Sequence, residues 1–149
     1  MDSVPRGPLI VGWKEYVDFV SWGIRRVKIK IDTGARTSAL DVTSYELREV
    51  EGQGLVADMR LALHRRHPRR LTAVRAPVLG MVVVSNSSGI REQRPLIETE
   101  LRLGPVTKRV QMTVTNRAGM LFRMILGRKA IEGDFIVDVS RKYLLKGSN

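Results

Sequence analysis

Short segments in which every second residue is apolar dominate this chain, and they restrict the folds that it can adopt. The alternation is clearest over residues 27–31, 55–63, 96–103 and 110–114. Because successive side chains of a strand point to opposite faces, such segments predict half-buried β-strands. Helical periodicity is scarce, and glycine or proline separates most of the segments. The sequence therefore predicts an all-β, barrel-like fold with one short helix after Gly127.

The composition predicts a single folded domain over residues 1–149. Apolar residues make up 43% of the chain and charged residues 28%, which allows a core and excludes a disordered chain. Cysteine is absent, so disulfides and thiolate catalysis are excluded, in agreement with a reducing compartment. The sequence shows neither a signal-peptide core near Met1 nor an apolar stretch of membrane-spanning length, so we expect a cytoplasmic protein with no membrane partner.

One predicted strand ends in a carboxylate on a tight turn. The alternating strand 27–31 leads directly into Asp32, Thr33, Gly34 and Ala35. A carboxylate at the rigid end of a strand keeps its orientation, and glycine beside it lets another backbone approach closely. An ordinary Asp-Thr-Gly turn would look the same in isolation. The tripeptide is thus a candidate catalytic site that needs support from elsewhere in the chain.

Two later segments supply that support. An apolar strand formed by residues 124–126 precedes Gly127 and Arg128, and a short helix is predicted over residues 128–132. Between the two glycine-bearing segments, the apolar run 81–84, a polar tip and the alternating strand 96–103 predict a β-hairpin. The tip consists of Ser85, Asn86, Ser87, Ser88 and Gly89.

In this order along the chain, these segments resemble the retropepsin family of aspartic peptidases. In that family a hydrophobic-hydrophobic-Gly-Arg element packs beneath the catalytic loop, and Ile125, Leu126, Gly127 and Arg128 match it. The predicted hairpin occupies the place of the family's substrate-covering flap, whose tip needs small, flexible residues. The resemblance implies the closed retropepsin barrel, also called the acid-protease fold.

The same resemblance assigns roles to the residues of the catalytic turn. It implies that Asp32 is the catalytic residue and that Thr33 locks its loop against the same loop of a second subunit. Gly34 would leave room for the substrate backbone, and Ala35 would begin the wall of the site. Residues 85–89 would cover the substrate and bind its backbone.

A bacterial subgroup of retropepsin-like proteins, long labelled "ATP-dependent zinc protease" and associated with RimK-type glutamate ligases, is similar to nearly the whole chain. Five ordered blocks carry this likeness: residues 11–15, residues 30–40, residues 85–89 with 94–95, residues 116–117, and residues 126–128 with 135–138. The chain departs from viral retropepsins at Arg36 and Thr37, which replace an acidic pair. With that pair missing, Asp134 or Asp138 is the expected partner of Arg128.

Peptide hydrolysis on this plan needs two carboxylates. One activates water while the other protonates the carbonyl oxygen, which a pair sharing one proton can do. The chain contains a single Asp-Thr-Gly, so an active peptidase requires a symmetric homodimer that brings two copies of Asp32 together. We expect an aspartic endopeptidase whose partners are a second copy of itself and a peptide or protein substrate.

A strong positive charge bears on the choice of substrate. The chain carries 26 Lys and Arg against 15 Asp and Glu, a net charge of +11. The densest cluster is residues 64–70, which contains Arg65, Arg66, Arg69 and Arg70. Such a field attracts polyanions, and the ligase association favours an acidic or glutamate-extended peptide. The alternative is a non-catalytic binding module that uses this basic insertion to hold an anionic protein or RNA, although nucleic acid is the less favoured partner.

The motifs for other chemistries are missing. His-Glu-x-x-His does not occur, and His64 and His67 lie among arginines that oppose a dication. The phosphate-binding motif Gly-x-x-x-x-Gly-Lys-Ser/Thr does not occur either. The sequence therefore predicts no metal site and no cofactor, against the zinc and ATP of the subgroup's old label.

Overall fold

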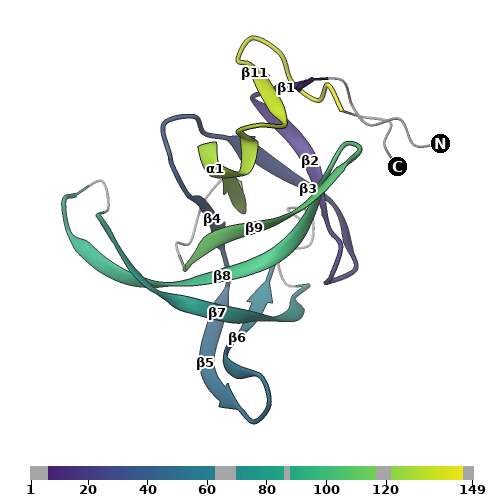
Figure 1. Ribbon diagram of the computed structural model, residues 1–149. Coiled ribbons are helices and arrows are strands. Elements are labelled where there is room, and N and C mark those ends of the chain that lie inside the picture. The colour runs from purple at the N-terminus through teal and green to yellow at the C-terminus, as the bar shows by residue number, and fades with distance from the viewer. Residues whose placement is uncertain (1–6, 63–69, 86–87, 117–121, 146–149) are drawn as a thin grey trace.

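A closed barrel of six strands forms the body of the molecule in the computed structural model, which describes residues 7–62, 70–85, 88–116 and 122–145. The strands follow one another around the barrel as β2 (Lys14–Phe19), β3 (Ile24–Ile31), β10 (Met124–Leu126), β4 (Ser38–Asp41), β9 (Val106–Thr115) and β8 (Arg91–Leu103). The ring closes because β2 also pairs with β8, where Asp18 lies opposite Arg102 and Phe19 opposite Leu101. Figure 1 shows the long strands β8 and β9 of this barrel, with α1 beside it.

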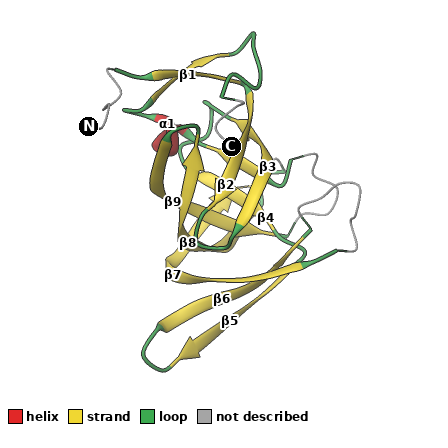
Figure 2. Cartoon of the chain, turned by 90° about the vertical axis from the view of Figure 1, so that its right-hand side faces the viewer, coloured by secondary structure: helices red, strands yellow, loops and turns green. Residues whose placement is uncertain are grey.

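Three further strands extend the sheet beyond the barrel. They are β7 (Thr72–Ser85), β6 (Gly54–Leu61) and β5 (Ser44–Val50), joined in that order to β8. The first half of β7 pairs with β6 and the second half with β8, so β7 links the barrel to the β5–β6 hairpin. Figure 2 shows that hairpin projecting from the barrel as a separate arm.

The two ends of the described chain meet in a small parallel sheet. Strands β1 (Leu9–Gly12) and β11 (Phe135–Asp138) pair along their whole length, and Ile10 lies opposite Ile136. The helix α1 (Arg128–Ile131) connects β10 towards β11 and packs beside β4 and β9. No helix in the described part of the chain is long and apolar enough to cross a membrane.

The barrel interior explains why the alternating segments fold as they do. In β3, Val27, Ile29 and Ile31 are buried while the lysines between them are exposed. The largest fully buried apolar side chains are Phe19, Ile29, Leu40, Met59, Leu61, Ile97, Leu101, Met112, Met124 and Leu126. Each such side chain stabilises the fold by about 1.5–3 kcal/mol relative to an exposed position. The strands of the barrel therefore pack on a dense apolar core, which fixes the positions of their ends.

The predicted all-β retropepsin-like barrel with one short helix is confirmed. Every predicted strand is present, and most are longer than the alternation indicated, as in β8, which begins at Arg91 rather than at Leu96. The helix ends at Ile131, one residue before the predicted end. The alternation failed to indicate β5, where charged residues interrupt the pattern after Tyr45 and Leu47 and six of the seven side chains are exposed.

Candidate active site

Asp32 lies immediately beyond the end of β3, where the barrel fixes its backbone. Ile31 is buried, and its N–H donates to the carbonyl of Trp13 at 2.8 Å. The N–H of Asp32 donates to the carbonyl of Leu126 on β10, also at 2.8 Å. Asp32 itself is half-buried. Hydrogen bonds to Trp13 and Leu126 thus hold the backbone that carries this carboxylate, and the residue remains partly exposed to solvent.

The residues after Asp32 form a turn that closes on the same carboxylate. The Ala35 N–H donates to the carbonyl of Asp32 at 3.1 Å, and the Gly34 N–H donates to Asp32 Oδ1 at 3.0 Å. A Cβ on Gly34 would lie 3.3 Å from that oxygen, which is tighter than ordinary packing. A larger residue at this position would press on the carboxylate that accepts the backbone hydrogen bond.

Gly127 packs directly beneath the turn, as the resemblance implied. A Cβ at this position would lie 2.8 Å from the carbonyl of Thr37 and 2.9 Å from that of Ala35. The Gly127 N–H donates to the hydroxyl of Ser38 at 3.1 Å, and both residues are buried. Ile125 and Leu126 extend this support, because Ile125 pairs with Lys30 on one side and Ala39 on the other. The loop and β10 therefore form one packed unit.

Arg128 completes the support, with a partner other than the expected one. Its N–H donates to the carbonyl of Ala35 at 2.8 Å, and its Nη1 donates to the carbonyl of Thr33 at 2.9 Å. Asp134 instead forms an ion pair with Lys108 at 2.6 Å. Asp138 accepts hydrogen bonds from the backbone and hydroxyl of Ser140, which hold its carboxyl pKa below the usual range. Neither acid is the partner of Arg128, because the loop's own carbonyl occupies that guanidinium.

The predicted flap is the hairpin of β7 and β8, whose paired strands end at Ser85 and Arg91. Ser88 and Gly89 lie exposed at its tip, and Gly89 has a φ of 81°, a left-handed conformation that favours glycine. Asn86 and Ser87 fall outside the described residues. Figure 1 shows the paired strands of this hairpin extending past the barrel.

A buried carboxylate beside the site was not predicted. Glu15 on β2 is 1% exposed, and it accepts hydrogen bonds from the N–H groups of Gly12, Leu144 and Leu145 at 2.7, 2.9 and 3.2 Å. It therefore ties the chain's last described residues to the strand that supports Ile31. The only signal in the sequence is a charged residue at an inward position of an alternating strand.

Lys14 covers the neighbouring aromatic rings. Its Nζ lies 4.6 Å from the ring centre of Trp13 and 5.5 Å from that of Tyr143. Partial burial lowers the Lys14 pKa, and repulsion from Lys142 and Lys28 lowers it further. Burial also raises the pKa of the Tyr143 hydroxyl. Trp13, next to Lys14 in the chain, accepts a hydrogen bond from the N–H of Ile31, one residue before Asp32. The sequence predicted no role for Lys14 or Tyr143.

The described residues contain no group of three His, Cys, Asp or Glu side chains that could hold a metal ion. His64 and His67 lie outside them, as do Arg65, Arg66 and Arg69 of the basic insertion. Arg70, at the end of that insertion, is described and exposed.

The barrel, the Asp-Thr-Gly turn and the supporting β10 element together define a retropepsin-like protein. The family model described as "Retropepsin-like aspartic endopeptidase RimB" matches residues 10–147, and the chain belongs to this RimB-like family. A solved structure of a Legionella pneumophila protein of unknown function shares the fold, with a TM-score of 0.77 at 22% identity over 93% of this chain and 98% of that one.

Curated relatives carry a different name. A protein of Desulfotalea psychrophila is 34% identical over 131 residues, and one of Parasynechococcus marenigrum is 33% identical over 135 residues. Each match covers 87% of this chain but only 28% of the relative. A protein of Shewanella halifaxensis is 31% identical over 94% of this chain and 30% of its own length. All three are named "Probable alpha-L-glutamate ligase". The chain thus spans less than a third of the relatives that it matches.

Proposed function

We propose that this protein is an aspartic endopeptidase that hydrolyses peptide bonds with a pair of Asp32 carboxylates, one from each subunit of a homodimer. The observation that carries the proposal is the Asp32 turn itself. Its carboxylate accepts a hydrogen bond from the Gly34 N–H and rests on backbone fixed by Leu126 and Arg128. A catalytic group held this firmly needs little reorganisation during the reaction.

The chemistry assigns complementary tasks to the two carboxylates. The ionised one takes a proton from a bound water as the water oxygen attacks the peptide carbon, and the protonated one gives its proton to the carbonyl oxygen. The tetrahedral intermediate then collapses: the carboxyl group that took the water proton gives it to the leaving nitrogen, the C–N bond breaks, and the other carboxylate takes a proton from one hydroxyl of the intermediate. The pair again shares one proton. The flap hairpin of β7 and β8 covers the substrate and excludes bulk water during these steps.

An exposed apolar surface supports assembly of the dimer. Ile10 and Ile136 lie opposite each other on β1 and β11 and are 54% and 55% exposed, while the adjacent Val139 is 72% exposed. Apolar side chains gathered on a small sheet with open edges favour pairing with another chain. We therefore propose that the β1–β11 sheets of two subunits meet at the two-fold axis. Specific activity should then fall on dilution, whereas a concentration-independent monomeric enzyme would contradict the dimer.

An acidic or glutamate-extended peptide is the proposed substrate. The net charge of +11 attracts anionic chains. The relatives that contain a homologous segment are named as probable glutamate ligases, so a peptidase that acts on glutamate-bearing chains would oppose that chemistry. The basic residues 64–70 would add to the attraction by speeding encounter.

The deciding experiment is Asp32→Asn, which keeps the shape of the side chain but can neither share the proton nor activate water. Purified Asp32→Asn should lose peptidase activity by at least about 10³-fold, measured on a glutamate-rich peptide by mass spectrometry. Asp58→Asn, on the β5–β6 hairpin, is the matched control and should remain active. Undiminished cleavage by Asp32→Asn would overturn the mechanism, and loss of activity in EDTA with recovery in zinc would show a metal-dependent enzyme instead.

A further inference from the structure

A pocket next to the catalytic turn is lined mainly by cationic and polar groups. It has a volume of about 550 Å³ and lies between the segment after the turn, α1 and the strands β8 and β9. We call it the basic pocket. Its lining residues are Arg36, Thr37, Glu98, Arg109, Val110, Gln111, Lys129 and Ala130.

The charges of the basic pocket do not balance. Arg109 Nε forms an ion pair with Glu98 Oε1 at 3.0 Å, which neutralises the one carboxylate of the lining. Arg36 and Lys129 remain as two further cations, and both are exposed. A pocket with two cations in excess attracts a carboxylate, and an exposed guanidinium can hold one through two parallel hydrogen bonds.

The basic pocket is fixed rigidly to the catalytic turn. The Lys129 N–H donates to the carbonyl of Arg36 at 3.0 Å, one residue beyond the bond between the Arg128 N–H and the Ala35 carbonyl. The segments that carry Arg36 and Lys129 are therefore bonded to each other and adjoin the backbone that positions Asp32.

The pocket is also within reach of a bound peptide. Arg36 is four residues from Asp32, so their Cα atoms are at most about 14 Å apart, and the intervening turn shortens this distance. An extended peptide advances about 3.3 Å per residue. A peptide therefore spans the distance from Asp32 to Arg36 within three or four residues of the bond over Asp32.

We propose that the basic pocket is a specificity subsite in which Arg36 and Lys129 bind an acidic side chain of the substrate, three or four residues from the cleaved bond. The proposal rests on the proposed peptidase function and names its substrate preference. In a symmetric dimer the pocket occurs twice, once on each side of the bond. The enzyme then selects acidic residues at matching positions on both sides, as a run of glutamates supplies.

The first test measures binding without cleavage. Fluorescently labelled octaglutamate and octaglutamine are titrated against protein carrying Asp32→Asn. Adding Arg36→Gln and Lys129→Gln should weaken octaglutamate binding about threefold for each charge removed, about tenfold together. The matched control adds Arg25→Gln and Lys28→Gln, which remove the same charge from exposed positions on β3. The control should change binding less than twofold, and octaglutamine should not distinguish the variants. Equal losses in both double variants, or no loss in either, would overturn the subsite.

The second test separates this inference from the proposed function. Active protein is given a series of otherwise neutral peptides with one glutamate moved along the chain. The wild type should favour glutamate three or four residues from the cleaved bond, and this preference should fall about tenfold in Arg36→Gln with Lys129→Gln. Cleavage with no positional preference would overturn the subsite and leave the peptidase intact. Absence of any cleavage, with the binding difference retained, would overturn the peptidase and leave the pocket as a site for acidic peptides.

Discussion

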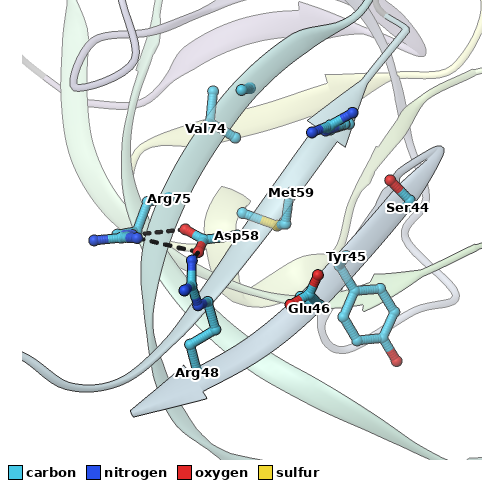
Figure 3. Close-up of a pocket in the computed structure, with 10 residues that line it drawn as sticks. Ser44, Tyr45, Glu46, Arg48, Asp58, Met59, Val74 and Arg75 are labelled. Carbon is cyan, nitrogen blue, oxygen red and sulfur yellow. Dashed lines mark hydrogen bonds and ion pairs between the residues drawn. The ribbon is translucent and has the colours of Figure 1, made fainter. Parts of the chain in front are cut away.

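The Asp32 turn and the β5–β6 hairpin both carry a hydrogen-bonded carboxylate, but different contacts surround the two carboxylates. Around Asp32 most contacts involve the backbone, and Gly127 lies so close to the turn that a single added carbon would collide with it. The backbones of β5 and β6 also pair with each other, but the contacts of Asp58 join charged side chains from the hairpin and from β7. Asp58 accepts from Arg75 Nε at 2.6 Å and from Arg48 Nη1 at 3.3 Å, beside a cavity of about 670 Å³ (Figure 3).

This difference in contacts determines how firmly the carboxylates of Asp32 and Asp58 are each held. Backbone hydrogen bonds shielded by packing persist with little dependence on salt or pH. Ion pairs between exposed side chains are screened by water and contribute little, and the side chains of Arg48 and Arg75 are 57% and 41% exposed. The candidate catalytic carboxylate of Asp32 thus lies on closely packed backbone, whereas the carboxylate of Asp58 lies among exposed ion pairs.

The largest expected effect comes from Gly127→Ala. The added Cβ would sit 2.8 Å from the backbone of Thr37, and neither backbone can move without disturbing β10 or the turn. Unfolding free energy should fall by about 3 kcal/mol, measured by chemical denaturation. Peptidase activity should fall further than stability accounts for, because the Asp32 turn is displaced.

The control for this prediction is Gly80→Ala on β7. A Cβ at Gly80 meets nothing within 4 Å, so this variant should stay within about 0.5 kcal/mol of the wild type. Equal stabilities for the two variants would show that the contact between Gly127 and the turn is loose, and the contrast between the two regions would lose its main support.

An intermediate effect is expected from Ser38→Ala. The variant removes the hydroxyl that accepts from the Gly127 N–H and leaves a buried donor without its partner. The loss should be about 1–2 kcal/mol of unfolding free energy, measured in the same way. Ser44→Ala, at an exposed position on β5, is the matched control and should change little. A comparable loss at Ser44 would point to intrinsic strand preference rather than to the lost hydrogen bond.

The smallest effect is expected on the hairpin, from Asp58→Asn. Hydrogen bonds from Arg75, and secondarily from Arg48, hold the Asp58 pKa below its usual range against the opposing effect of partial burial. A lowered folded-state pKa means that the stabilisation is complete above the unfolded pKa and is lost as the pH falls through the folded value. The melting temperatures of wild type and variant should therefore differ slightly at neutral pH and converge in acid. A difference that grows in acid would contradict this account.

The sequence was sufficient for the features that depend on local pattern. Alternation predicted β3, β6, β8 and β9, and the glycines after Asp32 and Leu126 marked the turn and its support. The partner of Arg128 was predicted wrongly, because the sequence shows which acids are nearby along the chain but not that the Thr33 carbonyl comes closer. The role of Glu15 was not predicted, because the three N–H groups that donate to it come from segments near both ends of the chain.

By itself, the sequence determined that this chain forms strands, that one strand ends in Asp-Thr-Gly, and that its family is retropepsin-like. The first two properties are local, since side-chain alternation and glycine spacing act within a few residues, and the third rests on the order of such local blocks along the chain. Only the tertiary structure decided that Gly127 touches the turn and that Arg36, Arg109 and Lys129 line one pocket. Ala35 is 92 positions from Gly127, and Arg36 is 73 positions from Arg109 and 93 from Lys129, so these contacts exist only once the barrel has closed and its core has set the register of β4, β9 and β10.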